Sequence, residues 1–392
     1  MSVASPRRQP EELIDLSFSR RCHVVGIGGP GMSPLASLLA ERGHVVTGSD
    51  MRDSEVTEIL RSEGITISIG HDASLVNDVD VVTYSTAIPM TNVEIVAAQS
   101  SGVALRHRSG LLASLCAVTN CMGVAGTHGK TTTTGLLTHI LSAAGMDPSC
   151  IVGGQVEGLP VGARHGSSEF LVLECDESDG TLDVLPLSHL IVTNVDVDHL
   201  DYFGSFEQLQ KTFVDAAIRT TGFVVVNVDD VSSEPIRNAL QGETRLRSFG
   251  VDASADVCVL SVVPETAGIF IQLRIDGVVV DCHSPLRGDH NAMNIAGAVA
   301  MATALGVTAS IACTAVESFR GVQRRFTERG EFNNAILVDD YAHLPAEIEA
   351  AIATARTHPR VSGKTIAVFQ PNRFHRIAAM ADSYADCFTN AD

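Results

Sequence analysis

The sequence has no tryptophan, few aromatic residues and an excess of acidic over basic residues. Its 27 lysines and arginines stand against 46 aspartates and glutamates, which gives a formal net charge of −19. Binding to nucleic acid requires clustered positive charge, so this balance argues against a general nucleic-acid binder and allows only a local cationic pocket. There is no uncharged apolar run of about 18 residues, so we expect no membrane insertion.

The chain also has no Cys-x-x-Cys pair among its nine cysteines, and several cysteines lie in apolar runs, such as Cys116 and Cys175. This spacing disfavours a zinc site, and buried free thiols are typical of a reducing compartment, so we expect a cytoplasmic protein. The polar segment Ser2–Pro10 is not followed by the apolar core of a signal peptide. We expect it to be a short disordered lead.

With 392 residues, 45% of them hydrophobic, the chain is long enough for two or three domains. Short β-branched runs alternate with helical stretches, which is the pattern of α/β domains with parallel sheets. Residues 244–283 differ, because alternating apolar residues and the Asp276-Gly277 turn predict a β-meander there. The boundaries that we expect are 1–19 for an N-terminal lead, then 20–115, 116–321 and 322–392 for three blocks.

The strongest local signal is Gly-Thr-His-Gly-Lys-Thr-Thr-Thr-Thr at residues 126–134, directly after the apolar run Val118–Ala125. In a strand, glycine turn and helix of this kind, backbone N–H groups and the positive helix end surround phosphate groups. Lys130 would reach the β and γ oxygens, and Thr131 or Thr132 could hold Mg²⁺. The motif predicts a site for ATP.

A second glycine motif, G-x-G-x-x-G at residues 26–31, lies between a predicted strand His23–Ile27 and a predicted helix Ser33–Arg42. Asp50 ends the next strand, where a dinucleotide-binding domain has its ribose-binding acid. Any diphosphate can use such a turn, so NAD, a UDP-sugar and a tight turn without a ligand all stay open.

Two acidic loops follow apolar strands. Glu174–Asp179 comes after Phe170–Leu173, and a carboxylate at a strand end near a phosphate loop is well placed to bind Mg²⁺, which makes Glu174 a candidate ligand. Asn194–Asp201 contains His199, which could bind a second divalent ion, orient substrate or be an ordinary loop histidine.

Polar residues in the second half of the chain form further candidates. Asn291 and Asn294 lie one helical turn apart, where their amides could read a purine edge or cap the helix. Arg325 belongs to an arginine pair that could neutralise a transferring phosphoryl group or lie on the surface. The segments Asp339–His343 and Gln370–Arg373 each follow a predicted strand, so both would face one crevice.

As an ordered set, these motifs resemble the Mur ligase family, the ATP-dependent amide ligases of peptidoglycan precursor synthesis. The glycine motif at residues 26–33 and the acidic loop Glu174–Gly180 are most similar to members that join L-alanine to UDP-N-acetylmuramate. The matching segments are His23–Ala36, Gly126–Thr134, Glu174–Gly180, Asn194–Asp201, Gly288–Asn294, Gly321–Phe326, Asp339–Ile348 and Phe369–Arg373.

The resemblance implies a Rossmann-like domain for the UDP substrate, a central ATPase domain and a C-terminal Rossmann-like domain, which we expect to be incomplete here. It implies ATP, UDP-N-acetylmuramate and L-alanine as substrates, Mg²⁺ as cofactor and an acyl-phosphate intermediate. It says nothing about the oligomeric state.

The resemblance also implies roles for single residues. Those implied to bind ATP are Gly126, Thr127, His128, Gly129, Lys130, Thr131, Thr132, Asn291, Asn294, Arg325 and Asp340. Those implied to bind the UDP substrate are Gly28, Gly29, Gly31, Met32, Ser33, Asp50, Ser85 and Thr86. Those implied to contact metal are Thr131, Thr132, Glu174 and His199, and those on the amino-acid side are His343 and Arg373. The implied catalytic set is Lys130, Glu174, His199, Arg325 and His343.

The chain departs from the family pattern on the amino-acid side. Leu344 stands where the family usually has the second histidine of His-His-Pro, and Asn372 stands where it usually has histidine. A related ligase that adds another amino acid or a peptide therefore stays open. From the residues alone, two further alternatives stay open: an NAD-dependent enzyme with an appended NTPase, and a non-catalytic ATP-binding regulator.

Overall fold

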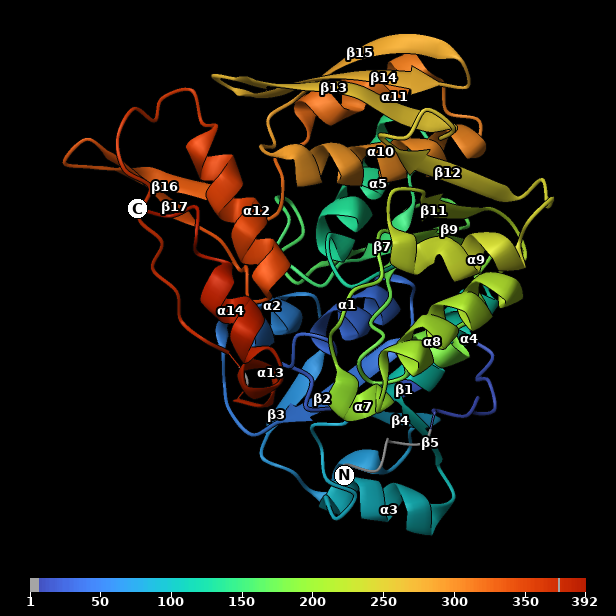
Figure 1. The fold of residues 1–392 in the computed structure, drawn as a ribbon. Coiled ribbons are helices and arrows are strands. Elements are labelled where there is room, and N and C mark those ends of the chain that lie inside the picture. Colours follow the sequence, from blue (N-terminus) through green and yellow to red (C-terminus); the bar gives the residue numbers. More distant parts are fainter. Residues whose placement is uncertain (1–6, 373) are drawn as a thin grey trace.

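The computed structural model describes residues 7–372 and 374–392, which form three separate β-sheets (Figure 1). The five-stranded sheet lies at the bottom of the view, the ten-stranded sheet lies above it, and the two-stranded sheet lies at the left. Helices accompany each sheet, so the predicted α/β architecture is confirmed. No helix within the described ranges is long and apolar enough to cross a bilayer.

The five-stranded sheet is parallel throughout, and its strand order is that of a Rossmann fold. Its strands, in spatial order, are β3 (Thr66–Ile69), β2 (Val45–Asp50), β1 (Arg21–Val25), β4 (Val81–Tyr84) and β5 (Ala104–His107). Its helical segments are α1 (Ser33–Glu41), α2 (Glu55–Ser62), η1 (Ala73–Val76), α3 (Val93–Ser101) and α4 (Arg108–Ala117). The order reverses between β1 and β4, so the glycine motif after β1 lies where such sheets bind ligands.

The ten-stranded sheet combines a parallel centre with antiparallel pairs at both edges. In spatial order its strands are β15 (Val278–Ser284), β14 (Gly268–Ile275), β13 (Val257–Glu265), β12 (Leu246–Gly250), β11 (Val224–Asn227), β10 (His189–Val192), β6 (Asn120–Ala125), β9 (Phe170–Glu174), β7 (Ser149–Ile151) and β8 (Ala163–Arg164). The strands β13, β14 and β15 form the predicted meander. Asp276 and Gly277 have φ angles of 48° and 86°, as the turn between β14 and β15 requires.

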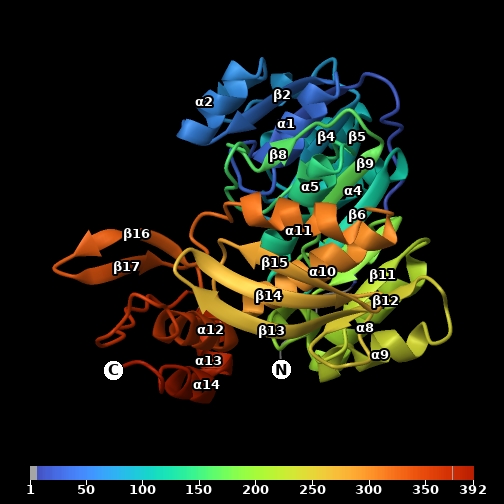
Figure 2. The same ribbon diagram turned by 90° about the horizontal axis from the view of Figure 1, so that it is seen from above.

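Helices cover both faces of this sheet. They are α5 (Lys130–Ala143), α6 (Thr181–Val184), α7 (Leu200–Phe203), α8 (Phe206–Arg219), η2 (Val231–Ser233), α9 (Glu234–Ala239), α10 (Asp289–Ala304) and α11 (Ala309–Ser318). The small residues of α10 let it lie close to the sheet, since a Cβ on Gly297 would be 3.2 Å from the Phe249 ring. Figure 2 shows α10 and α11 beside the strands of this sheet. One hydrophobic core lies between the sheet and α5, α10 and α11, and another extends into the first block.

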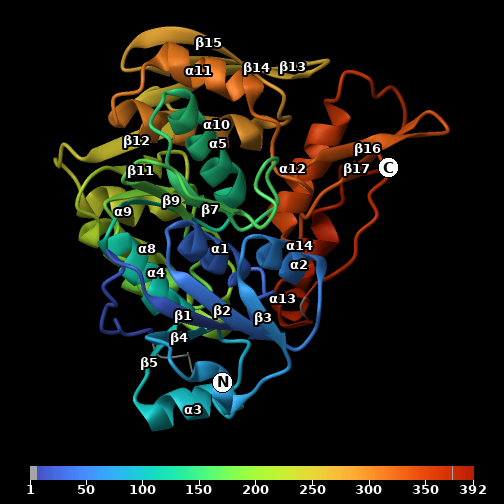
Figure 3. The ribbon, with the colours of Figure 1, turned by 180° about the vertical axis from the view of Figure 1, so that it is seen from behind.

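The C-terminal segment differs from the doubly wound start that we expected. Strand β16 (Thr327–Phe332) pairs antiparallel with β17 (Ala335–Asp339), and α12 (Pro345–Arg356), α13 (Phe374–Ala379) and α14 (Ala381–Asp386) follow. The hairpin projects outwards in all three ribbon views (Figure 3). The prediction of a strand at Thr365–Phe369 is wrong, because no neighbouring strand pairs with that segment.

The expected disorder of the N-terminal lead is also wrong for its described part. Arg7 Nη1 lies 2.5 Å from Asp215 Oδ2, and Arg8 Nε donates to the Asp179 carbonyl at 3.0 Å. Further along, Leu16 is buried in the core. Contacts with distant residues and the burial of Leu16 therefore fix this irregular segment. Neither can be predicted from the composition of the segment itself.

A glycine in β2 positions the first glycine motif. A Cβ on Gly48 would lie 2.8 Å from the Val24 carbonyl oxygen and 2.5 Å from Ile27 Cδ1. We predict that Gly48→Ala lowers stability by about 1–3 kcal/mol through overpacking, measured as a lower thermal midpoint. The control is Val45→Thr in the same strand, at an exposed position, which should change little; equal midpoints for both variants would contradict the packing.

Candidate functional site

The loop Gly126–Gly129 joins β6, near the middle of the large sheet, to α5. Gly126 has a φ of 134°, and a Cβ there would lie 2.1 Å from Thr193 Oγ1. Gly129 has a φ of 79°, and its Cβ would lie 2.2 Å from Asn294 Oδ1. Neither position can carry a side chain, so both glycines are required by the close approach of neighbouring elements.

The end of β10 holds this loop through hydrogen bonds. His128 N donates to Asn194 Oδ1 at 2.8 Å, and Asn194 Nδ2 donates back to the His128 carbonyl at 3.1 Å. Thr193 Oγ1 also donates to the His128 carbonyl, at 2.6 Å, and Thr127 N donates to the Asn194 carbonyl at 3.1 Å. Asn194 thus fixes the loop backbone, a role that the sequence did not indicate.

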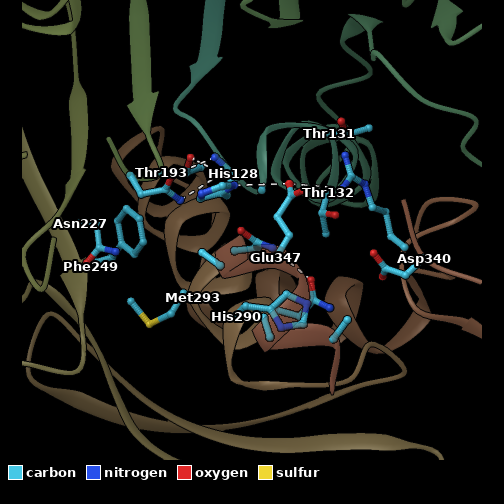
Figure 4. Close-up of a pocket in the computed structure, with 18 residues that line it drawn as sticks. His128, Thr131, Thr132, Thr193, Asn227, Phe249, His290, Met293, Asp340 and Glu347 are labelled. Carbon is cyan, nitrogen blue, oxygen red and sulfur yellow. Dashed lines mark hydrogen bonds and ion pairs between the residues drawn. The ribbon is translucent and has the colours of Figure 1, made fainter. Parts of the chain in front are cut away.

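A cavity of about 290 Å³ lies against the loop (Figure 4). Phe249 and Met293 give it an apolar wall, and His290 lies on the far side from His128 in the figure. The structure brings many of the expected ATP residues to this one cavity, namely His128, Gly129, Thr131, Thr132, Asn291, Asn294, Arg325 and Asp340. They come from α5, α10 and the C-terminal segment, so the cavity lies between two of the blocks.

Lys130 is turned away from this cavity and towards a buried carboxylate. Its Nζ lies 2.9 Å from Glu177 Oε2 and also donates to the Gly126 carbonyl. Burial disfavours the ammonium, but the Glu177 carboxylate raises the pKa of Lys130 above its ordinary value. Burial raises the pKa of Glu177 to about 7 against the attraction of Lys130. The lysine is therefore kept charged by nearby carboxylates, of which Glu177 contacts it directly.

Glu174 ends β9 beside the start of α5. Its Oε1 accepts from Thr131 Oγ1 at 3.1 Å, and its Oε2 accepts from Gly153 N at 2.6 Å. Burial raises the pKa of Glu174. Both Thr131 and Thr132 line the cavity, and it is Thr131 that donates to Glu174.

The oxygens of Glu174 and Thr131 are the kind that Mg²⁺ prefers, and Mg²⁺ typically takes one or two protein ligands and completes its shell with phosphate and water. Within the described part of the chain, no three His, Cys, Asp or Glu side chains gather in a metal-binding arrangement. These two residues therefore fit a Mg²⁺ ion that is shared with a nucleotide and not a site made of protein groups alone.

His199 is placed differently from the other candidates. It has a left-handed backbone with a φ of 53°, its Nε2 lies 3.1 Å from Asp198 Oδ2, and Arg376 Nη2 lies 3.1 Å from the same oxygen. It does not line the cavity. Arg373, a candidate on the amino-acid side, lies outside the described residues.

Glu347, in the first turn of α12, is a site residue that the sequence analysis missed. Its Oε1 lies 3.4 Å from His128 Nδ1 and 3.8 Å from Arg325 Nη1, and its Oε2 accepts from His343 N at 2.9 Å. Burial opposes ionisation of Glu347, but the side chains of His128 and His343 hold its pKa well below the ordinary value. A glutamate at the third position of a helix suggests a capping box at most.

Asp340, which lines the cavity, and His343, which does not, are both fixed by backbone contacts. Asp340 accepts from Phe326 N and from Ala342 N, each at 2.6 Å, and burial raises its pKa. His343 Nδ1 lies 2.9 Å from the Tyr341 carbonyl oxygen. Both side chains are thus held by the turn that leads from β17 to α12.

The first glycine motif is built around Asp50. Gly28 N donates to Asp50 Oδ2 at 2.9 Å, and Ser33 Oγ donates to the Gly29 carbonyl at 3.1 Å. Met32 is buried in the core. Asp50 and Ser33 thus hold the turn by hydrogen bonds, and Met32 anchors it in the core. At the carboxyl end of β4, the two other candidates are the half-buried Ser85 and the exposed Thr86.

Arg108, which the sequence analysis did not select, connects the two glycine motifs. A Cβ on Gly31 would lie 2.2 Å from Arg108 Nη1, so the guanidinium packs directly on the first turn. Arg108 Nη2 lies 2.6 Å from Asp179 Oδ2, in the acidic loop that also contains Glu174 and Glu177. The first turn and the phosphate loop are therefore parts of one continuous polar region.

Comparisons with known proteins decide the family. Residues 21–119 match the model of the Mur ligase family catalytic domain, residues 124–302 match the Mur ligase middle domain, and residues 324–391 match the Mur ligase glutamate ligase domain. The chain belongs to the Mur ligase family. The resemblance read from the motifs is confirmed, and this Mur ligase is accordingly an ATP-dependent ligase.

Its relatives share most of its length. The UDP-N-acetylmuramate–L-alanine ligase of Bradyrhizobium sp. (strain ORS 278) is 40% identical over 383 residues, which are 94% of this chain and 80% of that protein. The equivalent ligase of Nitrobacter winogradskyi is 38% identical with the same coverage. The crystal structure of UDP-N-acetylmuramate-alanine ligase from Thermotoga maritima superposes with a TM-score of 0.78 at 29% identity, over 95% of this chain and 84% of that one.

The charge on His128 gives a test of this site. Burial disfavours the imidazolium, but Asp196, at 3.1 Å, and Glu347 raise the pKa of His128 to about 9. Because the pKa of His128 is higher in the folded protein than its unfolded value of 6.5, the charged imidazole stabilises the fold. This contribution is complete below pH 6.5 and is lost as the pH rises through about 9.

We predict that His128→Gln lowers the free energy of unfolding by roughly 2–3 kcal/mol near pH 6 and by much less above pH 9. Thermal melting of both proteins across this range measures the difference. His283→Gln, which removes an exposed histidine paired with Glu265, is the control. A pH-independent difference for His128→Gln would show that His128 is not held charged by the two carboxylates.

Proposed function

We propose that this Mur ligase joins the amino group of L-alanine to the lactyl carboxylate of UDP-N-acetylmuramate, driven by ATP, during the cytoplasmic synthesis of peptidoglycan precursors. The observation that carries the proposal is the cavity at the phosphate loop, where Thr131 and Thr132 meet Arg325 and Asp340 from the C-terminal segment. The ligases named above, with about 40% identity over 94% of the chain, support this choice of substrates.

ATP takes the cavity with its phosphates on the loop Gly126–Thr132. The backbone N–H groups of the loop and the N-terminus of α5 point to the phosphates. The adenine lies at the start of α10, beside Asn291 and Asn294, and the ribose lies at Asp340. Thr131 and Glu174 would hold Mg²⁺, with Thr132 and His199 as further candidate contacts, and the ion would neutralise charge on the phosphates.

The UDP substrate takes the turn Gly28–Gly31 at the start of α1. Gly28, Gly29 and Gly31 let the backbone approach the diphosphate, as in other G-x-G-x-x-G turns. Asp50, Met32 and Ser33 shape the turn through the contacts described above, and Ser85 and Thr86 face the substrate from the end of β4. Arg108, which contacts both this turn and the acidic loop, sets the distance between the two substrates.

The first chemical step is the transfer of the γ-phosphoryl group to the lactyl carboxylate. The carboxylate oxygen attacks the phosphorus, the bond to ADP breaks, and an acyl phosphate forms. Lys130 exchanges Glu177 for phosphate oxygens, and Arg325 approaches from the C-terminal segment, so that both cations meet the charge that develops in the transition state. The protein supplies position and charge and no covalent nucleophile.

In the second step the neutral amine of L-alanine attacks the acyl carbon, and the tetrahedral intermediate expels phosphate. The amine must lose a proton to a nearby acceptor. His343 is the candidate: its Nδ1 is directed to the Tyr341 carbonyl, and this leaves Nε2 for the amine. Arg373 is assigned to the amino-acid carboxylate on the family resemblance alone.

Removing the lysine tests whether the two substrates have separate sites. We predict that Lys130→Ala lowers phosphate release by at least about 10²-fold, because a cation at the transferring group is lost. The affinity for UDP-N-acetylmuramate, measured by calorimetry, should stay the same. Lys211→Ala, at an exposed position on α8, is the control. Loss of UDP-substrate binding together with turnover would argue against separate sites.

Removing the carboxylate at the end of β9 tests the proposed metal contact. We predict that Glu174→Ala shifts the Mg²⁺ titration of activity to concentrations about tenfold higher or more, since one oxygen ligand is lost. Glu169→Ala, at an exposed position just before β9, is the matched control. An unchanged titration would remove Glu174 from the metal site.

A further inference from the structure

The two carboxylate oxygens of Glu347 have different partners. Oε2 accepts from His343 N at 2.9 Å and from Leu344 N at 3.3 Å, so it caps the first turn of α12. These bonds fix the side chain and account for one oxygen only. Oε1 is directed away from the helix and towards the cavity, which Glu347 lines (Figure 4).

Oε1 meets two cations that come from other parts of the chain. It lies 3.4 Å from Nδ1 of His128, in the phosphate loop, and 3.8 Å from Nη1 of Arg325, which precedes β16. The Glu347 side chain is only 13% exposed, so water screens these contacts weakly. The carboxylate thus lies where an anion is stabilised by the loop and by the C-terminal segment at once.

Arg325 is assigned above to the phosphates of ATP, and His128 belongs to the loop Gly126–Thr132 on which those phosphates are proposed to lie. A phosphate oxygen that contacts His128 and Arg325 would lie within a few ångströms of the Glu347 carboxylate, and two negative charges at that distance repel each other strongly in a partly buried site. Asp340 and Asp196 add further negative charge around the same groups. The Glu347 carboxylate therefore opposes the approach of a phosphate to these two cations.

We propose that Glu347 competes with the phosphate chain of ATP for His128 and Arg325, so that both cations exchange the carboxylate for phosphate oxygens as ATP binds. This inference rests on the proposed function, because it takes the cavity to be the ATP site. Glu347 is then a regulatory residue of that site: it lowers ATP affinity and keeps the two cations in place. The exchange also breaks a direct link between the phosphate loop and α12.

The test removes the charge and keeps the shape. Glu347→Gln retains one oxygen for the helix cap, and calorimetry with Mg²⁺ present measures the affinity of the full chain for ATP, ADP and adenosine. We expect ATP to bind about tenfold more tightly to the variant, ADP to gain less, and adenosine, which has no phosphate, to bind as it does to the unchanged protein. Glu349→Gln, at an exposed position on the same helix, is the control and should change none of the three.

Unchanged or weaker ATP binding by folded Glu347→Gln would overturn the inference, and so would an equal gain for adenosine, which would indicate a reshaped cavity. Failure of the unchanged, folded protein to bind ATP would instead overturn the proposed function. Glu347→Asp provides a second variant should the glutamine variant not fold: it keeps the charge but withdraws it by one methylene group, and it should give a smaller gain for ATP and none for adenosine.

Discussion

The loop between β6 and α5 has no space for a side chain at either end, and the central block is organised around that constraint. The end of β10 fills the space behind Gly126, and α10 fills the space behind Gly129. The first contact requires β10 to be the neighbour of β6, and the second requires a helix of small residues that can approach α5. The order of the strands and the composition of α10 therefore both fix one loop backbone.

A strongly acidic chain binds polyanionic substrates here by placing a few cations against carboxylates. Lys130 is held by Glu177, Arg108 by Asp179, and His128 by Asp196 and Glu347. Each partner carboxylate compensates the cost of burying a positive charge and fixes its position. The cations are thus fixed in place and partly neutralised, and we propose that the phosphates of ATP compete with these carboxylates for Lys130 and His128. This explains how a net charge of −19 is compatible with nucleotide chemistry.

Local pattern was sufficient for most of the architecture and for the phosphate loop. The parallel strands, the meander with its Asp276-Gly277 turn and the loop at Gly126 each depend on residues that are close in sequence. Glu347, Asn194 and Arg108 could not be predicted in the same way, because their roles depend on which segments meet in space. The residues next to them in sequence suggest only a helix cap for Glu347, a strand end for Asn194 and a helix start for Arg108.

The errors in the C-terminal segment have the same cause. An apolar run such as Thr365–Phe369 becomes a strand only beside a partner, and the hairpin of β16 and β17 offers it none. That hairpin has its own local signal, since Asn333 and Asn334 both have positive φ, as a two-residue turn requires. The fixed lead at Arg7 shows the opposite case, where distant acidic residues order a segment that has no pattern of its own.

We propose that one chain holds a nucleoside triphosphate and a UDP-sugar at the same time, in two adjacent sites. The most direct measurement is a calorimetric titration with UDP-N-acetylmuramate of protein already saturated with a non-hydrolysable ATP analogue, with NAD titrated in parallel. We predict one bound UDP-sugar per chain and no heat from NAD. Loss of UDP-sugar binding in the presence of the analogue would contradict two separate sites, and NAD binding in its place would contradict the ligase assignment of the first block.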